Sequence, residues 1–334
     1  MSSHDLPAAL RYPLFVPRII GLCIRYHALP SIITHANPGL PFGGLPFGPK
    51  HEIFSLFGTI LPFDYLPIVD SSTRRFSIAS DFAAIHGFPI IVKPDIGHRG
   101  VDVQRADDIE ELEAIIFGQT WDYIVQRYSP LPEEYGIFYC KMPDSKRGEI
   151  ISLTHKKIPV LKGDGESTIQ TLIDASDIHN KTAVAGTLVN RLDEIPAEGV
   201  TIQTLVGASH AAGSMYYNAA HLETEELRKK VFDICSVKGF YFGRLDVKCE
   251  GAEHLRRGEF EIVEINGSTS ECIHVYDARI PFIEGLGVLN DQWDRLFRIS
   301  AAHRNEGEGI GLIEMIKLYK RFYSATKRAV GRLW

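Results

Sequence analysis

Strand-like segments follow one another at short intervals in the middle of this chain, and this spacing is the strongest constraint on its fold. Segments rich in aromatic and β-branched residues span 121–128, 135–141 and 149–157, and only short connecting pieces separate them. Parallel neighbours would need crossovers of about a dozen residues or more, so these strands are expected to pair as antiparallel hairpins. Because such strands outnumber the long helices here, the sequence predicts an α+β fold rather than a doubly wound parallel sheet.

The other elements follow from hydrophobic periodicity and from the positions of glycine and proline. Short strands are expected at 89–94 and 101–105, and the segments 240–250 and 259–267 are expected to form an antiparallel pair. Asp107 is predicted to cap the helix that follows it. Helices are predicted over 17–28, 49–58, 78–88, 108–117, 223–237, 288–304 and 311–330, with a helical part at 167–192.

Composition is typical of an ordinary globular protein. The chain has 334 residues, of which 45% are hydrophobic and 23% charged, and its formal net charge is −6. This charge argues against nucleic acid as a partner, because binding to phosphates requires a basic excess. The five cysteines form no C-x-x-C pair, so neither a zinc cage nor a disulfide framework is expected. No signal peptide and no apolar run of about 18 to 20 residues is found, which predicts a cytoplasmic location.

The chain divides into segments of different composition. Residues 6–51 contain no Asp or Glu, and the stretch 36–48 is too rich in proline and glycine for regular structure. The expected division is a short N-terminal segment at 1–48, a first lobe at 49–122, a second lobe at 123–308 and a basic C-terminal helix at 309–334.

Two strands near the end of the chain carry hard oxygen ligands. Asp246 lies in GRLDVK, while Glu264 and Asn266 lie on one face of EIVEING. Magnesium binds carboxylate and amide oxygens of this kind when substrate phosphates complete its shell. The alternative is a solvent-facing strand edge with ordinary acids, but Arg244 beside Asp246 favours a functional cluster. These three side chains are therefore predicted to bind metal.

Lys93 is a second candidate for a binding residue. It follows the apolar run Phe88–Val92 and precedes the turn GHRG. A buried strand holds an ammonium group in a fixed place, and a glycine turn offers backbone N–H groups to a phosphate. Taken alone, the same pattern also fits a solvated lysine followed by a hairpin.

Read in order, these motifs resemble the ATP-grasp superfamily, in which two α+β lobes sandwich a nucleotide. The similarity runs from about Lys50 to Asn266 through VKP-x-x-G-x-x-G, VQRY, GDGESTIQTLI, GRLDVK and EIVEIN. The GDGESTIQTLI stretch is similar to one in the ATP-grasp part of cyanophycin synthetases, and GRLDV with EIN resembles D-alanine:D-alanine ligases. The resemblance implies an ATP-grasp fold whose N-terminal domain is truncated and which has extra terminal helices.

The resemblance also implies a role for each matching residue. Contacts with the ATP phosphates are implied for Lys50, Lys93 and Lys156, and for the glycine loop with Gly97, Arg99 and Gly100. Adenine and ribose contacts are implied for Gln126, Arg127, Tyr128 and Glu134, with Glu133 as the register alternative. Asp246, Glu264 and Asn266 match the ligands of two Mg²⁺ ions, with Mn²⁺ as the alternative metal, and Arg244 matches an arginine that steadies a tetrahedral intermediate. The loop that follows departs from the D-alanine ligases, and two interpretations of its polar residues are open: they line an acceptor pocket, or the loop is purely structural. These residues are Ser268, Thr269, Ser270, Glu271 and His274.

The implied function is the ADP-forming ligation of a small-molecule carboxylate to an amine. ATP would convert the carboxylate into an acyl phosphate, while magnesium, lysines and an arginine stabilise the developing charge. A glycine-hinged loop would keep water away from this intermediate. Two alternatives stay open: an ATP-grasp kinase that phosphorylates a small molecule, and a non-catalytic nucleotide-binding module.

Both ends of the chain have a basic, amphipathic character. In the N-terminal segment, Arg11, Arg18 and Arg25 recur every seven residues. The C-terminal helix has apolar residues at helical spacing, Leu312, Ile316, Tyr319 and Tyr323, and basic ones before Trp334, namely Lys317, Lys320, Arg321, Lys327, Arg328 and Arg332. Two interpretations are open: peripheral contact with a membrane surface, and packing of both helices on the lobes in place of the missing domain. A homodimer also stays open.

Overall fold

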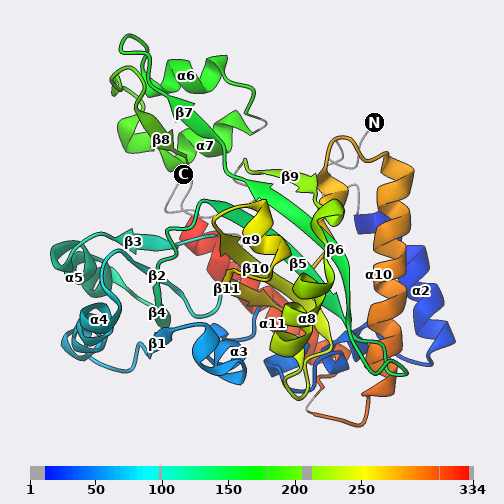
Figure 1. The fold of residues 1–334 in the computed structure, drawn as a ribbon. Coiled ribbons are helices and arrows are strands. Elements are labelled where there is room, and N and C mark those ends of the chain that lie inside the picture. Colours follow the sequence, from blue (N-terminus) through cyan, green and yellow to red (C-terminus); the bar gives the residue numbers. More distant parts are fainter. Residues whose placement is uncertain (1–11, 98–99, 179, 205–212, 308, 331–334) are drawn as a thin grey trace.

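The computed structural model describes residues 12–97, 100–178, 180–204, 213–307 and 309–330. Two antiparallel sheets form the main part of the molecule, and a two-stranded sheet lies in an inserted lobe (Figure 1). Every strand pairing in the described part of the chain is antiparallel. The α+β class predicted from the short connections is confirmed.

The first lobe contains a four-stranded sheet in the order β1-β4-β2-β3. Its strands are β1 (Phe63–Leu66), β2 (Ile90–Pro94), β3 (Gln104–Ala106) and β4 (Tyr123–Arg127), and its helices are α3 (Lys50–Leu56), α4 (Ser72–His86) and α5 (Ile109–Gly118). Apolar side chains of the sheet pack against α4 and α5 in one core. Because β4 pairs with both β1 and β2, the sheet of this lobe extends to Arg127, past the boundary expected at residue 122.

Helix caps decide where the helices of this lobe begin. Asp108 caps α5 rather than the predicted Asp107, and its Oδ1 accepts a hydrogen bond from the N–H of Glu111 at 2.8 Å. An N-cap side chain reaches the amide two or three residues ahead, and Asp107 lies one residue too early. Helix α4 starts earlier than predicted, because Ser71 accepts from the N–H of Arg74 at 3.2 Å.

The second lobe contains a five-stranded sheet in the order β11-β10-β5-β6-β9. The strands are β5 (Glu133–Cys140), β6 (Glu149–Lys157), β9 (Met215–Asn218), β10 (Phe242–Cys249) and β11 (Glu261–Asn266). Helices α8 (Glu225–Cys235) and α9 (Ala252–Arg256) lie in front of this sheet in Figure 1. Apolar residues on that face of the sheet pack against both helices to form one core. The polar residues of the site lie on the opposite face.

A second core covers part of that opposite face. It joins the strand residues Phe138 and Phe242 to α2 (Val16–Arg25), η3 (Pro30–His35), η9 (Ile273–Tyr276), α10 (Phe282–Ala302) and α11 (Leu312–Val330). The short N-terminal segment therefore packs into the second lobe and belongs to its core. Helix α10 starts at Phe282, earlier than the predicted residue 288.

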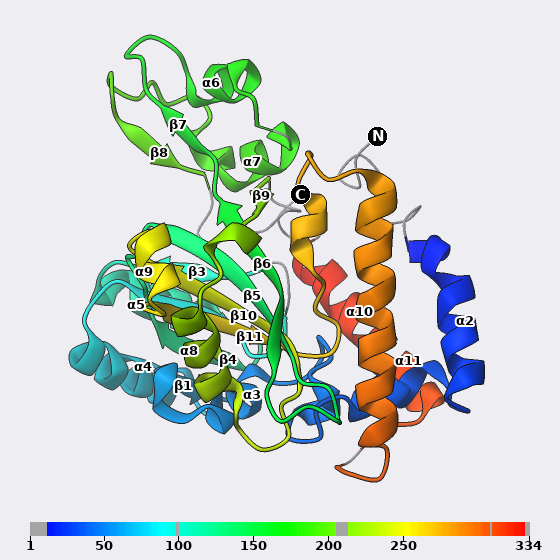
Figure 2. The same ribbon diagram turned by 45° about the vertical axis from the view of Figure 1, so that its right-hand side comes forward.

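Residues between β6 and β9 form an inserted lobe with its own small core (Figure 2). It contains β7 (Val160–Lys162), α6 (Ile169–Ala175), α7 (Lys181–Thr187), η6 (Val189–Arg191) and β8 (Thr201–Gln203). The helical part predicted at 167–192 is thus broken in two. Thr168 caps α6 and Asn180 caps α7, and both residue types favour helix starts over helix interiors.

The C-terminal helix packs on the second lobe. Phe322 is buried, and Met315 and Leu318 contact the same core. The apolar stripe predicted from Leu312, Ile316, Tyr319 and Tyr323 is therefore not the buried one: Ile316, Tyr319 and Tyr323 are each more than 40% exposed. Arg11, Arg332 and Trp334 lie outside the described residues, as do the side chains of Lys327 and Arg328. No helix in the described ranges is both long enough and apolar enough to cross a bilayer.

Candidate active site

The pairing of β10 with β11 brings the predicted metal ligands together. Its register sets Arg244 opposite Asn266 and Asp246 opposite Glu264. Alternation along β10 then puts Arg244 and Asp246 on one face of the sheet, while Leu245 lies in the core on the other face. Neighbouring strands β5 and β6 add Glu134 and Lys156 to the polar face through the same alternation.

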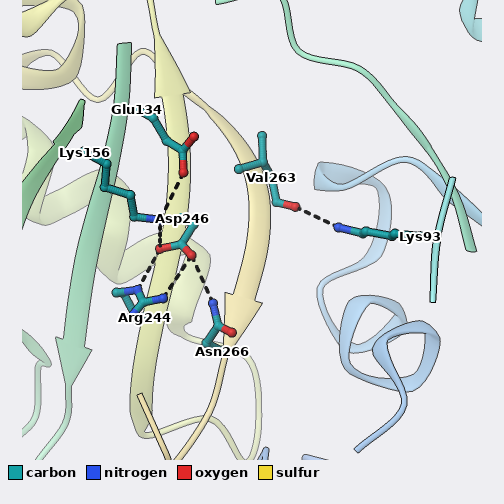
Figure 3. Close-up of polar contacts among 7 residues, drawn as sticks. All are labelled: Lys93, Glu134, Lys156, Arg244, Asp246, Val263 and Asn266. Carbon is teal, nitrogen blue, oxygen red and sulfur yellow. Dashed lines mark hydrogen bonds and ion pairs between the residues drawn. The ribbon is translucent and has the colours of Figure 1, made fainter. Parts of the chain in front are cut away.

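A β-bulge at Val263 links the two lobes. Asp246 pairs with Glu264 whereas Val247 pairs with Ile262, so Val263 is an extra residue in β11. Strand β11 is an edge strand, and the carbonyl of Val263 faces the first lobe. It accepts a hydrogen bond from Nζ of Lys93 at 3.5 Å (Figure 3) and another from Nε2 of Gln126 at 3.1 Å.

Asp246 is the centre of a buried polar network, which Figure 3 shows. Its Oδ1 lies 2.9 Å from Nζ of Lys156 and 2.7 Å from Nε of Arg244. Its Oδ2 accepts from Nη2 of Arg244 at 3.1 Å and from Nδ2 of Asn266 at 3.2 Å. Lys156 also lies 3.1 Å from Oε1 of Glu134. Three side chains therefore bond to the carboxylate of Asp246, and Glu134 joins the network through Lys156.

The network is charged in spite of its burial. Burial raises the pKa of Asp246, but Arg244 and Lys156 outweigh this effect and hold the pKa at about 2. Burial lowers the pKa of Lys156, yet the attraction of Asp246 and Glu134 leaves that pKa above its usual value. Both side chains stay ionised at neutral pH. The pair can bind a charged ligand without first changing protonation state.

Lys50 and Lys93 bring two more cations from the first lobe. Nζ of Lys93 lies 5.2 Å from the ring centre of Phe54, and burial lowers the pKa of Lys93 to about 8, although Glu264 opposes the shift. Burial also lowers the pKa of Lys50, and Glu264 and Asp95 oppose that shift. Burial thus lowers the pKa of both lysines, and a bound polyphosphate is expected to raise it again because it favours the protonated form.

The glycine turn after β2 is attached to the first of these lysines. Lys50 opens α3, and its Nζ donates to the carbonyl of Gly97 at 2.7 Å. Gly100 has a φ of +74°, which favours glycine. Arg99 lies outside the described residues.

The three consecutive residues for which adenine contacts are implied, 126–128, have different surroundings. Gln126 is buried and bonded to Val263. Arg127 forms an ion pair with Glu261 at 2.7 Å. Two cations lie over the ring of Tyr128: the guanidinium of Arg105 is 4.8 Å from the ring centre, and Nζ of Lys248 is 5.4 Å from it.

The structure separates Glu133 and Glu134, the two candidates for the carboxylate that contacts the ribose of ATP. Glu134 is on the polar face of β5 and bonds to Lys156. Glu133 points to the opposite face, where its Oε2 lies 2.5 Å from Nε2 of His155. Glu134 therefore shares the site face with Asp246, and Glu133 does not.

The residues predicted to line the acceptor pocket follow β11 directly. Ser268, Ser270 and His274 are buried, whereas Thr269 is exposed. Nδ1 of His274 lies 2.6 Å from Oγ of Ser152 on β6, and burial lowers the pKa of this histidine. Glu271 accepts a hydrogen bond from the hydroxyl of Tyr276 at 2.6 Å. The structure thus brings Ser268, Ser270 and His274 into the interior beside the polar face.

Sequence reasoning missed residues that support the site. Asp95 is 2% exposed, and its carboxylate accepts from the backbone N–H of His51 at 2.8 Å and lies 2.7 Å from the imidazole Nδ1. This fixes the start of α3, and with it Lys50, at the end of β2. In the sequence, Asp95 could have been recognised as an acid that directly follows the apolar run and Lys93-Pro94. A Cβ atom on Gly136 would lie 3.1 Å from Cδ of Arg244 and 3.4 Å from Cε of Lys156. Nothing in the sequence around Gly136 indicated this contact.

The donor set fits magnesium completed by phosphates better than a closed protein cage. No group of three His, Cys, Asp or Glu side chains that could hold a metal is found within the described ranges. Asp246 and Glu264 supply two carboxylates from paired positions, and rotation of the Asn266 amide would supply a third oxygen. Mg²⁺ is usually held by one or two carboxylates together with substrate phosphates. The residues therefore fit the predicted metal.

Comparisons with known proteins give remote structural likenesses. No protein-family model and no curated protein matches the sequence. A bifunctional glutathione synthetase from Pasteurella multocida is similar over 88% of this chain and 38% of its own, with 12% identity and a TM-score of 0.37. A D-alanine–D-alanine ligase from Bacillus anthracis matches over 78% and 69%, with 14% identity and a TM-score of 0.44. VanG D-Ala:D-Ser ligase from Enterococcus faecalis matches over 79% and 64%, with 14% identity and a TM-score of 0.43.

These neighbours are ATP-grasp ligases, the superfamily that the sequence motifs resemble. The chain spans well under half of the glutathione synthetase. Identities of 12 to 14% and TM-scores below 0.5 transfer neither a substrate nor a residue role.

Proposed function

We propose that this protein is an ATP-dependent, ADP-forming ligase that joins a carboxylate to an amine through an acyl phosphate. The observation that carries the proposal is the network of Lys156, Arg244 and Asn266 around Asp246, with Lys50 and Lys93 facing it from the other lobe. Buried cations on both sides of a carboxylate pair match the needs of a bound polyphosphate and its metal. A protein without such a ligand would gain little from burying them.

The residues divide the reaction between them. Lys50, Lys93 and Lys156 would bind phosphate oxygens and offset the charge of the transferred phosphoryl group. Asp246, Glu264 and Asn266 would hold Mg²⁺, or Mn²⁺ in its place, which supplies Lewis-acid stabilisation of that group when bound. Since Asp246 is fully bonded in this structure, it must exchange at least one partner before it can coordinate a cation.

Two chemical steps would follow each other at this site. A carboxylate oxygen attacks the γ-phosphorus of ATP, and ADP leaves. The amine nitrogen then attacks the acyl carbon, a proton leaves the nitrogen, and inorganic phosphate departs. Arg244, which lies on the polar face beside Asp246, would stabilise the oxyanion of the second step.

Labelled substrate provides the test. The purified protein is screened for ADP release against pairs of carboxylates and amines, and the product is identified by mass spectrometry. With an ¹⁸O-labelled carboxylate, the proposal requires one ¹⁸O atom in the released phosphate, because the acyl phosphate passes its bridging oxygen to the leaving group. A phosphorylated product without free phosphate would show a kinase. Nucleotide binding without ADP release from any pair would show a binding module.

A further inference from the structure

The amide of Asn37 links the N-terminal segment to the strand that carries Arg244 and Asp246. Asn37 follows η3 and is fully buried. Its Oδ1 accepts from the N–H groups of Tyr241 and Phe242 at 2.8 and 2.9 Å. Its Nδ2 donates to the carbonyls of Phe242 and Gly43 at 2.7 and 3.0 Å. Both acceptor positions and both donors of the amide are therefore used on backbone groups.

The carbonyl of Gly43 extends this link to the end of β11, the strand that carries Glu264 and Asn266. Besides Nδ2 of Asn37, it accepts from the N–H of Ser268 at 3.2 Å, two residues after Asn266. Gly44 and Gly267 touch without side chains: a Cβ on Gly44, whose φ is +80°, would lie 2.6 Å from Cα of Gly267. A Cβ on Gly267 would lie 2.5 Å from Cα of Gly44. No residue but glycine permits this approach of the two turns.

Asn37 and the Gly43–Gly44 turn thus hold the flanks of both strands at the same end of the site. The contacts fall at Phe242, two residues before Arg244, and at Gly267 and Ser268, directly after Asn266. Arg244 and Asn266 are opposite each other in the sheet, and both side chains bond to Asp246. The spacing of these groups therefore depends on a segment far away in sequence.

We infer that Asn37 and the Gly43–Gly44 turn are positioning elements for Arg244 and Asn266, so that the acid-free N-terminal segment is part of the catalytic apparatus. The inference rests on the proposed function for its effect on turnover, and on the contacts alone for its effect on the strands. A displacement of about 1 Å in reacting groups can cost about 10²-fold in rate. A backbone clamp on both strands would prevent such a displacement.

Hydrogen–deuterium exchange of the ligand-free protein tests the inference without reference to any activity. Asn37→Ala should speed exchange about tenfold or more in peptides that cover 241–246 and 265–268. Thr34→Val is the matched control. Thr34 is buried in the same segment, but its hydroxyl bonds to the carbonyl of Ser31 at 2.8 Å and to the N–H of Ile310 at 3.2 Å, away from both strands. The control should leave those peptides unchanged.

A second pair of variants keeps the test decisive if Asn37→Ala does not fold. Gly44→Ala places a methyl group against Gly267, whereas Gly58→Ala has a similar φ of +64° and meets nothing within 4 Å. Both variants carry the same kind of backbone strain, so only Gly44→Ala should loosen residues 265–268. Turnover in the ADP-release assay should fall about 10²-fold in Asn37→Ala and Gly44→Ala, and no more than a few-fold in the controls.

The outcomes separate this inference from the proposed function. Exchange unchanged at both strands in Asn37→Ala and Gly44→Ala would overturn the inference, whatever the wild type catalyses. Faster exchange in the variants, together with no ADP release from the wild type, would contradict the ligase proposal. It would still support the role of Asn37 and the Gly43–Gly44 turn in holding the two strands. Equal loss of turnover in Gly44→Ala and Gly58→Ala would assign the effect to general destabilisation and reject the positioning role.

Discussion

At Asp246, two cations and an amide bond to one buried carboxylate. A buried ion pair is weak evidence for stability, because desolvation offsets much of the attraction. The arrangement is better explained by what it can bind. Glu264 differs from Asp246: it is half-buried, and no described residue makes a hydrogen bond or an ion pair with its carboxylate. Its charge is therefore available to a cation.

Glu264→Gln should abolish ADP formation and leave the fold intact. The change keeps the shape of the side chain and removes the charge, and Lewis-acid stabilisation worth several kcal/mol corresponds to at least about 10²-fold in rate. Glu261→Gln, on the same strand and paired with Arg127, is the control and should retain turnover within a few-fold. Steady-state ADP release at saturating Mg²⁺ measures both. Normal turnover by Glu264→Gln would remove Glu264 from the metal site.

Arg244→Ala should lower turnover far more than it weakens nucleotide binding. The guanidinium is expected to act on the tetrahedral intermediate, and loss of one such donor costs about 10²- to 10³-fold. Arg244→Lys keeps the positive charge near Asp246 but removes the guanidinium with its several N–H donors. It therefore separates the effect of the lost donors from the effect of the lost charge. Calorimetric ADP binding and kcat are measured for both variants. Collapse of nucleotide affinity with normal turnover of the saturated complex would show a binding role instead.

Nucleotide binding should weaken as the pH rises through about 8. The pKa of Lys93 in the free protein is about 8, because burial penalises its charge, and phosphate oxygens bind the protonated form. Above this pKa the protein must take up a proton on binding, so the association constant should fall by about tenfold per pH unit until the pKa of the complex is reached. Binding of ADP measured from pH 6.5 to 10 gives the profile.

Lys93→Arg is the control for this profile, because a guanidinium stays protonated throughout that range. In this variant, the association constant for ADP should no longer begin to fall near pH 8, and binding should still be measurable. If the association constant of Lys93→Arg falls at the same pH as that of the wild type, another group is titrating.

Among the elements, α2 presents an apolar face that nothing in the described structure covers. Val16, Ile20 and Ile24 follow one another at four-residue spacing and are 49%, 54% and 69% exposed. On an adjoining edge, Arg18 pairs with Asp294 of α10, and Arg25 lies 3.9 Å from the same carboxylate. Both terminal helices pack on the second lobe, as one of the two interpretations of the sequence expected, but this face of α2 has no such role. An interfacial helix has this composition.

We propose that α2 contacts anionic membranes, and the Ile20→Asp, Ile24→Asp double variant tests this. Both side chains are exposed, so folding should be unaffected, while co-sedimentation with phosphatidylserine-containing vesicles at low salt should be lost. Ile283→Asp on α10 is a matched control, because Ile283 is 76% exposed on another helix. Wild type that stays in the supernatant at low salt, or a double variant that sediments equally well, would contradict the proposal.

On the scale of the whole molecule, the N-terminal segment completes the core of the second lobe. Phe15, Leu22, Ile32, Ile33, Leu45 and Phe47 are all less than 10% exposed and pack against the sheet and α10. A chain that begins at Pro49 should therefore fail to fold. Each of these side chains contributes about 1.5 to 3 kcal/mol when buried, and their sum is comparable with the whole stability of a domain.

Circular dichroism and size exclusion of the chain 49–334 measure this outcome. A soluble, cooperatively unfolding protein would show that residues 1–48 are an appendage. It would also remove the premise that this segment takes the place of a larger N-terminal domain.

The sequence by itself determined the α+β class, most elements and the grouping of Arg244 with Asp246 and of Glu264 with Asn266. Side chains alternate between the two faces along any strand, so Arg244 and Asp246 lie on the same face independently of the tertiary fold. Short connections exclude parallel pairing. It could not determine which strands of the middle segment belong to which lobe. Strand β4 has the same local pattern as β5, and only its partners β1 and β2 place it in the first lobe.

Tertiary structure alone decided the contacts between distant segments. Glu134 and Glu133 are both candidates in the sequence, and the register with Lys156 and Lys248 puts Glu134 on the site face. The bulge at Val263, the anchor at Asp95 and the close approach of Gly44 to Gly267 leave no local periodic signal. Local propensity acts over a few residues, whereas these contacts depend on how elements more than 40 residues apart pack and hydrogen-bond. For the same reason, the amide of Asn37 can be recognised as a link between the ligand strands only once the chain is folded.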